Sequence, residues 1–185
     1  MKIFPGWIDH SELEFHQAYM TKEIGRIVEG GSFGGRLFGY LYPTFPNWKY
    51  DAVCAWDNEH TYIPVDEALS YFADINAQTE LPENLMTIDK FKQDHPYASA
   101  HDIYFEDFHP LEKFDIISIG QISGHIDWQL QYQHAIEILK DDGIVIARNL
   151  LHNKHSTPIR NVIEKYFKII DYSACGRNAA IQPRK

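Results

Sequence analysis

The sequence has no long hydrophobic run. No apolar stretch approaches the roughly 20 residues that a helix needs to cross a bilayer. The N-terminal segment also lacks the basic residues and long apolar stretch of a secretion signal. From these two features we expect a soluble, cytoplasmic protein with no membrane partner.

Positive charge is also scarce. The chain carries 17 Lys and Arg against 26 Asp and Glu, a formal net charge of −9, and its basic residues are scattered singly or in twos. A protein that holds nucleic acid through its phosphates needs a clustered positive field. We therefore expect no nucleic-acid partner, and a small-molecule, peptide or sugar acceptor is favoured instead.

Cysteine is rare as well, with only Cys54 and Cys175 in 185 residues. Both fall in segments predicted to be a strand or a strand turn. Two unpaired, mostly buried thiols are the expected state, which is typical of a protein in a reducing compartment.

Apolar runs of strand length alternate with helical patterns along most of the chain. Strands are predicted at 26–29, 50–56, 103–105, 114–119 and 144–147, and helices at 8–24, 36–41, 83–91, 126–139 and 156–167, with a further helix beginning at Pro64. This alternation predicts an α/β fold, a doubly wound and mostly parallel Rossmann-like sheet. The runs 167–174 and 178–182 are too close together for a helical crossover, so they must form a C-terminal antiparallel hairpin.

The order of elements predicts one domain over residues 1–185. Residues 1–25 form an N-terminal helical segment and residues 26–185 the Rossmann-like core. A homodimer is compatible with the sequence. The least regular part, residues 78–99, is either a lid over a site or a surface loop, and we favour the surface loop.

A glycine-rich turn directly follows the first predicted strand. In open α/β sheets, ligands bind beyond the carboxyl ends of the strands, where backbone N–H groups are free and glycine lets a ligand approach closely. The sequence therefore predicts a ligand site at this turn. The residues expected to form it are Glu29, Gly30, Gly31, Ser32, Phe33 and Gly35.

The spacing of Glu29, Gly31 and Gly35 resembles motif I of the class I S-adenosylmethionine-dependent methyltransferases. The form Glu-x-Gly-Ser-Phe-x-Gly is similar to that of small-molecule O-methyltransferases. It does not fit the dinucleotide pattern G-x-G-x-x-G, which disfavours a dinucleotide-dependent oxidoreductase. The resemblance implies a methyltransferase-type sheet, closed by the hairpin, and S-adenosylmethionine as the cofactor.

The resemblance also implies two further contacts with the cofactor. Asp57, after the second predicted strand, would accept hydrogen bonds from both ribose hydroxyls, with Glu59 as the alternative. Asp107 and Phe108, after the third predicted strand, would contact the adenine, with Glu106 replacing Asp107 if the strand register shifts by one.

Metal-dependent relatives carry acids after the fourth and fifth strands. Here the fourth strand runs into Gly120, which we place in the cofactor site, and the fifth runs into Arg148 and Asn149. Hard cations usually require carboxylates, so we expect no catalytic metal.

Two histidines follow the strands that end beside the expected acceptor. His125 and His152 are the candidate general bases, because histidine exchanges protons near neutral pH. Trp128, Arg148 and Asn149 are the candidate acceptor-binding residues, and Arg148 would hold an anionic acceptor unless it is only a surface salt-bridge residue.

Together these features predict metal-independent methyl transfer from S-adenosylmethionine to an oxygen of a small-molecule or sugar-like acceptor. The alternative is a degenerate methyltransferase-type domain that binds the cofactor or a protein partner without catalysis.

Overall fold

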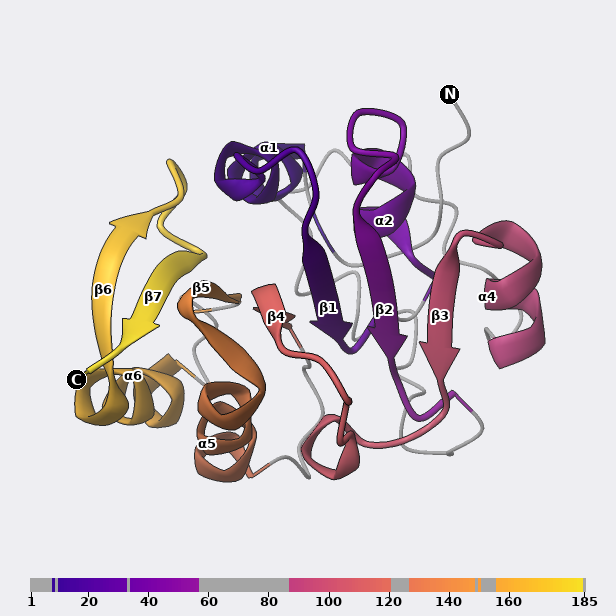
Figure 1. Ribbon diagram of the computed structural model, residues 1–185. Coiled ribbons are helices and arrows are strands. Elements are labelled where there is room, and N and C mark those ends of the chain that lie inside the picture. The colour runs from indigo at the N-terminus through magenta and orange to yellow at the C-terminus, as the bar shows by residue number, and fades with distance from the viewer. Residues whose placement is uncertain are drawn as a thin grey trace, which may run out of the picture.

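A seven-stranded mixed sheet organises the chain, with strand order β3-β2-β1-β4-β5-β7-β6 (Figure 1). The computed structural model describes residue 8 and residues 10–32, 34–56, 87–120, 127–148, 150 and 156–184. Within these ranges, no helix combines the length and the hydropathy needed to cross a bilayer. The strands are β1 Arg26–Gly30, β2 Lys49–Val53, β3 Ala98–His101, β4 Phe114–Ile119, β5 Leu139–Ala147, β6 Phe167–Tyr172 and β7 Ala179–Pro183.

The first five strands pair in parallel, and β7 pairs antiparallel with both β5 and β6. The predicted fold class, a doubly wound sheet closed by a C-terminal hairpin, is confirmed. The strand β4 shows why this fold class could be predicted from the sequence. All six of its residues are buried, since it lies between β1 and β5 with helices on both faces.

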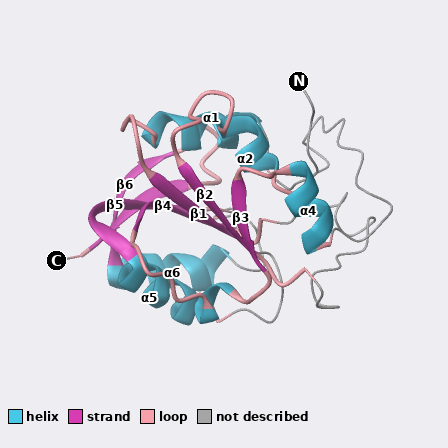
Figure 2. Cartoon of the chain, turned by 45° about the vertical axis from the view of Figure 1, so that its right-hand side comes forward, coloured by secondary structure: helices cyan, strands magenta, loops and turns pink. Residues whose placement is uncertain are grey.

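Helices cover both faces of the sheet (Figure 2). Their bounds are α1 His10–Tyr19, α2 Arg36–Leu41, α4 Ile88–Asp94, α5 Trp128–Ile138 and α6 Ser156–Tyr166. Successive strand residues point to opposite faces. Ile27 therefore packs in the hydrophobic cluster with side chains of α1, α2 and α4, while Val28 packs in the cluster with those of α5 and α6.

The third strand lies earlier in the chain than predicted. β3 ends at His101, and the residues predicted as strand enter a short 3-10 helix at Phe105–Asp107. Ile103 is partly exposed, while Phe105 is fully buried in the hydrophobic cluster that also holds side chains of α5 and α6. The prediction was wrong because β3 is a short edge strand of small residues that lacks a strong apolar pattern.

The surface-loop interpretation is also wrong for the described part of residues 78–99. Phe91 is fully buried in the cluster around α2 and α4, and His95, also fully buried, packs against its ring. The Tyr97 ring stacks on that of Tyr42, with centroids 3.7 Å apart. Residues 78–86 and the helix predicted from Pro64 lie outside the described residues.

Neither cysteine forms a disulfide, as predicted, but only Cys54 is buried. Cys175 is exposed because it lies in the turn of the β6–β7 hairpin, beyond the residues that pair in the sheet.

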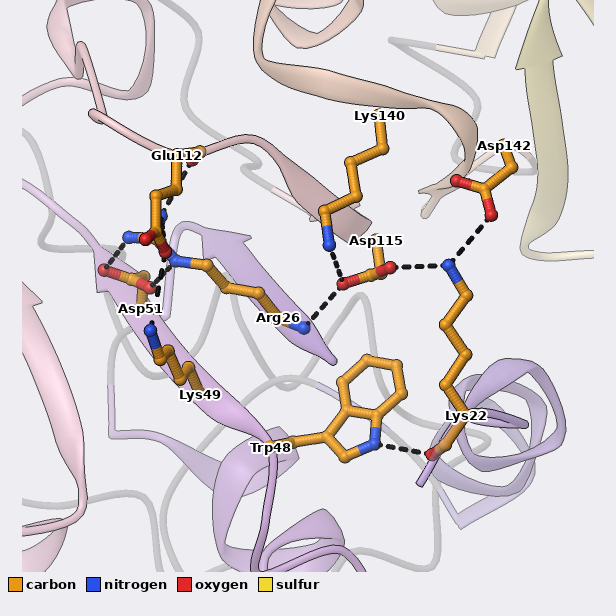
Figure 3. Close-up of polar contacts among 9 residues, drawn as sticks. All are labelled: Lys22, Arg26, Trp48, Lys49, Asp51, Glu112, Asp115, Lys140 and Asp142. Atoms are coloured by element: carbon orange, nitrogen blue, oxygen red, sulfur yellow. Dashed lines mark hydrogen bonds and ion pairs between the residues drawn. The ribbon is translucent and has the colours of Figure 1, made fainter. Parts of the chain in front are cut away.

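A buried carboxylate at the amino ends of the parallel strands, opposite the end that carries the glycine turn, connects four segments of the chain (Figure 3). Asp115 accepts hydrogen bonds from Lys22 Nζ at 2.7 Å, Lys140 Nζ at 2.8 Å and the Arg26 backbone N–H at 2.8 Å. Burial alone would raise the pKa of Asp115, but these bonds outweigh it and lower the pKa. The carboxylate form therefore links β4 to β1, to β5 and to the segment after α1.

We expect Asp115→Ala to lower the free energy of unfolding at pH 7 by about 2–4 kcal/mol, since it removes charged hydrogen bonds and leaves the partly buried Arg26 N–H without this acceptor. Because the folded-state pKa is lowered, this stabilisation is present above the unfolded pKa of about 3.9 and is lost as the pH falls through the folded value. Urea denaturation at pH 7 and at successively lower pH would measure it. Asp142→Ala, at an exposed carboxylate that also binds Lys22, is the control and should change little. An equal loss in both variants would contradict the prediction.

Candidate active site

The carboxyl ends of the parallel strands meet along one edge of the sheet. The register pairs Gly30 with Val53 and with Ile119, Val53 with His101, and Ile119 with Ala147. The chain leaves β1 between β2 on one side and β4 on the other, which is the point where strand order reverses. Open α/β sheets bind ligands at such a point.

The glycine turn is built as a left-handed bend after β1. Gly31 has φ +84° and donates its N–H to Val53 O at 2.8 Å. Gly35 has φ +73° and donates to Ser32 O at 2.8 Å, immediately before α2. The left-handed region strains other residues, which explains glycine at these two positions. Phe33 lies outside the described residues.

At three of the predicted cofactor glycines, Gly35 among them, the space where a side chain would lie is filled by protein. A Cβ on Gly30 would lie 2.9 Å from the Phe105 ring, and one on Gly120 would lie 2.6 Å from Arg148 Cζ. At Gly35 the Cβ would collide with the His95 ring. The missing side chains at these positions serve packing, so their roles in cofactor binding stay predictions.

His95 anchors the turn from a distant part of the sequence. Its ring is fully buried, Nε2–H donates to Gly34 O at 3.0 Å, and Nδ1 accepts from the Tyr97 hydroxyl at 2.8 Å. Sequence reasoning missed this role, because a single histidine in an irregular segment carries no signal of its distant partner.

Glu29 and Arg148 form a buried ion pair at this edge. Both side chains are 4% exposed, and Arg148 Nη1 donates to Glu29 Oε1 at 2.8 Å. Glu29 Oε2 is buried and has no hydrogen-bond partner among the described residues. Burial raises the pKa of Glu29 to about 7, against the opposing effect of the Arg148 charge. One oxygen of a buried carboxylate is thus left to accept a donor.

Helix α1 places two further buried polar residues, Glu12 and His16, near the Glu29–Arg148 pair. His16 Nδ1–H donates to Glu12 O at 2.7 Å, and its Nε2 accepts from the Ser118 hydroxyl at 2.9 Å. Burial and the nearby Arg148 charge lower the pKa of His16 to about 3. With both ring nitrogens bonded, His16 is a neutral structural residue at neutral pH.

The end of β3 carries an acid that sequence reasoning missed. Asp102 follows β3 directly, and its Oδ1 accepts from the Trp56 backbone N–H at 2.9 Å, which joins the segments after β2 and β3. Asp107 lies instead in the 3-10 helix, and Phe108 is buried against His101 and Phe114. The signal for Asp102 was an acid just after a run of small residues.

The predicted acceptor residues are only partly described. Trp128 is the first residue of α5 and packs partly buried on the core of the α5–α6 face. Arg148 is buried, so it is not a surface salt-bridge residue, and its guanidinium bonds Glu29. The remaining predicted site residues, Asp57, His125, His152 and Asn149, lie outside the described residues. Across the described ranges, no three His, Cys, Asp or Glu side chains gather in a way that could hold a metal ion.

The sequence matches no protein-family model and no curated protein. Solved structures are similar to it. A ribosomal protein L11 methylase from Lactobacillus delbrueckii subsp. bulgaricus is 16% identical, with 99% of this chain and 82% of that chain covered and a TM-score of 0.59. A protein provisionally described as a caffeoyl-CoA O-methyltransferase, from Staphylococcus aureus, is 12% identical, with 97% and 86% covered and a TM-score of 0.64.

A third solved structure contains a ligand. The N-methyltransferase NodS from Bradyrhizobium japonicum WM9, in complex with S-adenosylhomocysteine, is 8% identical, with 96% of this chain and 89% of that chain covered and a TM-score of 0.52. These likenesses, together with the strand order, show that the chain has the class I methyltransferase fold.

Proposed function

We propose that the protein binds S-adenosylmethionine at the carboxyl edge of β1 and transfers its methyl group to an acceptor. The observation that carries the proposal is Glu29 Oε2, a buried carboxylate oxygen with no hydrogen-bond partner in the described part of the chain, directly before the glycine turn. A buried acceptor of this kind requires a donor. The ammonium group of the cofactor is a donor of suitable charge, because charge-assisted hydrogen bonds are the stronger ones.

Other residues of this edge fit the rest of the cofactor. Gly31 lets the chain turn at the switch point, where the ligand would lie against the backbone. Asp57 remains the proposed acceptor for the ribose hydroxyls. Since β3 ends at His101, we transfer the adenine contact from Asp107 and Phe108 to Asp102. The S-adenosylhomocysteine bound to the structurally similar NodS supports this choice of cofactor.

A sulfonium cofactor supplies an activated methyl group for an in-line displacement by the acceptor nucleophile. The protein must then hold the nucleophile in line, exclude water and remove a proton from a hydroxyl acceptor. We propose His125 or His152 for the proton transfer, and Trp128 and Asn149 for holding the acceptor.

The finer proposal is metal-independent transfer to oxygen of a small or sugar-like molecule in the cytoplasm, by a single domain spanning the chain. It rests on the form of motif I, on the available histidines and on the net charge of −9. The similar structures do not favour one kind of acceptor, because they include a ribosomal protein methylase, a protein provisionally described as an O-methyltransferase, and an N-methyltransferase.

Calorimetric titration with S-adenosylhomocysteine tests the proposal, with NAD as the control ligand. We expect binding of S-adenosylhomocysteine with a micromolar or tighter Kd and no binding of NAD. Absence of S-adenosylhomocysteine binding would overturn the proposed function. Binding without transfer of labelled methyl to a panel of hydroxyl acceptors would favour the degenerate domain.

A further inference from the structure

We propose that Arg148 is a positioning residue for cofactor binding: it holds the Glu29 carboxylate ionised and oriented, so that the oxygen not bonded to Arg148 receives the ammonium group of the cofactor. This inference rests on the proposed function. It goes beyond that function by giving Arg148 a role in selecting a cofactor with a free amino group, in place of the predicted role in binding an anionic acceptor.

The geometry shows how Arg148 reaches Glu29 across the sheet. Arg148 follows β5, and its backbone N–H donates to Ile119 O at 3.0 Å, which fixes the main chain beside the end of β4. The guanidinium then passes over Gly120, where a Cβ would lie only 2.6 Å from Cζ and Nη1. Nη1 meets Glu29 Oε1 at 2.8 Å on β1. Glycine at position 120 thus leaves room for a contact between the ends of β5 and β1.

The charges around Glu29 explain why it needs this partner. Burial favours the neutral acid, and the negative charge of Glu12 on α1 adds to that effect. Arg148 opposes both through its positive charge and its hydrogen bond to Glu29. His16 also faces this cluster from α1, but its pKa of about 3 keeps it neutral above pH 5. Glu29 accepts an ammonium group only as a carboxylate, so its ionisation controls the contact.

The test compares two ligands over pH 6–9. S-adenosylhomocysteine carries the amino group, and 5′-methylthioadenosine lacks the amino-acid end but keeps the nucleoside. In the wild type, affinity for S-adenosylhomocysteine should fall up to about tenfold for each pH unit below the pKa of Glu29, which is about 7. Affinity for 5′-methylthioadenosine should not change with pH over this range.

Arg148→Met removes the largest influence that lowers the pKa of Glu29, so its S-adenosylhomocysteine profile should move to higher pH. Binding at pH 7 should be at least about tenfold weaker than in the wild type, with partial recovery near pH 9. Arg148→Lys keeps the charge and should restore part of the profile. Glu29→Gln cannot ionise and should bind S-adenosylhomocysteine weakly with no dependence on pH. Glu12→Gln, the matched control on α1, should keep the wild-type shape with at most a small shift to lower pH.

Each other outcome has a defined meaning. Equal weakening of both ligands at every pH in Arg148→Met, or an unchanged S-adenosylhomocysteine profile, would overturn the role of Arg148. A pH dependence that disappears in Glu12→Gln and persists in Glu29→Gln would overturn the role of Glu29.

If the wild type binds 5′-methylthioadenosine and S-adenosylhomocysteine equally well, the ammonium contact is wrong while the cofactor site stands. If it binds neither, the proposed function fails and this inference fails with it. Circular dichroism of each variant checks that it is folded.

Discussion

Glu29→Leu should lower the free energy of unfolding at pH 7 by about 3–5 kcal/mol, the usual cost of leaving one charge of a buried ion pair without its partner. Arg148 is 4% exposed, so its guanidinium charge would be left buried without the Glu29 carboxylate. Arg148→Met should cost less, because the remaining Glu29 can bind a proton. Its pKa is already about 7 with Arg148 in place. Urea denaturation of both variants would measure this asymmetry.

The double variant Glu29→Leu/Arg148→Met is the control for the pair. Replacing both buried charges by apolar side chains of similar volume is often close to neutral. We therefore expect the double variant to be more stable than Glu29→Leu alone, even though it cannot form the proposed contact with the cofactor. Additive losses in the double variant would show that the two residues contribute separately and not as a pair.

His95→Ala should lower the free energy of unfolding by about 2–4 kcal/mol, because it leaves a cavity and removes one buried and one partly buried hydrogen bond. The ring bonds Gly34 O and the Tyr97 hydroxyl, and it packs against Phe91. Affinity for S-adenosylhomocysteine should fall as well, since the glycine turn loses its anchor to the segment after α4. Chemical denaturation and calorimetric titration would measure the two effects.

His10→Ala is the matched control, because that histidine is 71% exposed on α1, where it pairs with the exposed Glu14 and contacts the Tyr40 ring edge-on. It should leave stability and ligand affinity nearly unchanged. If His95→Ala lost stability but kept full affinity for S-adenosylhomocysteine, the anchor would not be needed to shape the turn.

Residues with a periodic neighbourhood were predictable, and those that depend on distant partners were not. The six apolar-rich residues of β4 are buried on both faces, so their run is visible in any window of sequence. The β6–β7 hairpin followed from the short gap between its two strands. β3 was misplaced because an edge strand of small residues, Ala98–His101, shows no such run, and Asp102 at its end was missed with it.

The sequence by itself determined the order of strands and helices, the closing hairpin and the position of the glycine turn, because these depend on local periodicity and on glycine spacing. Only the tertiary structure decided which polar residues meet at that turn. His95 lies 61 residues from Gly34, and Arg148 lies 119 residues from Glu29. Sheet register and burial bring these groups within hydrogen-bond distance. No local sequence pattern predicts that these groups come into contact, or the pKa that burial gives to Glu29.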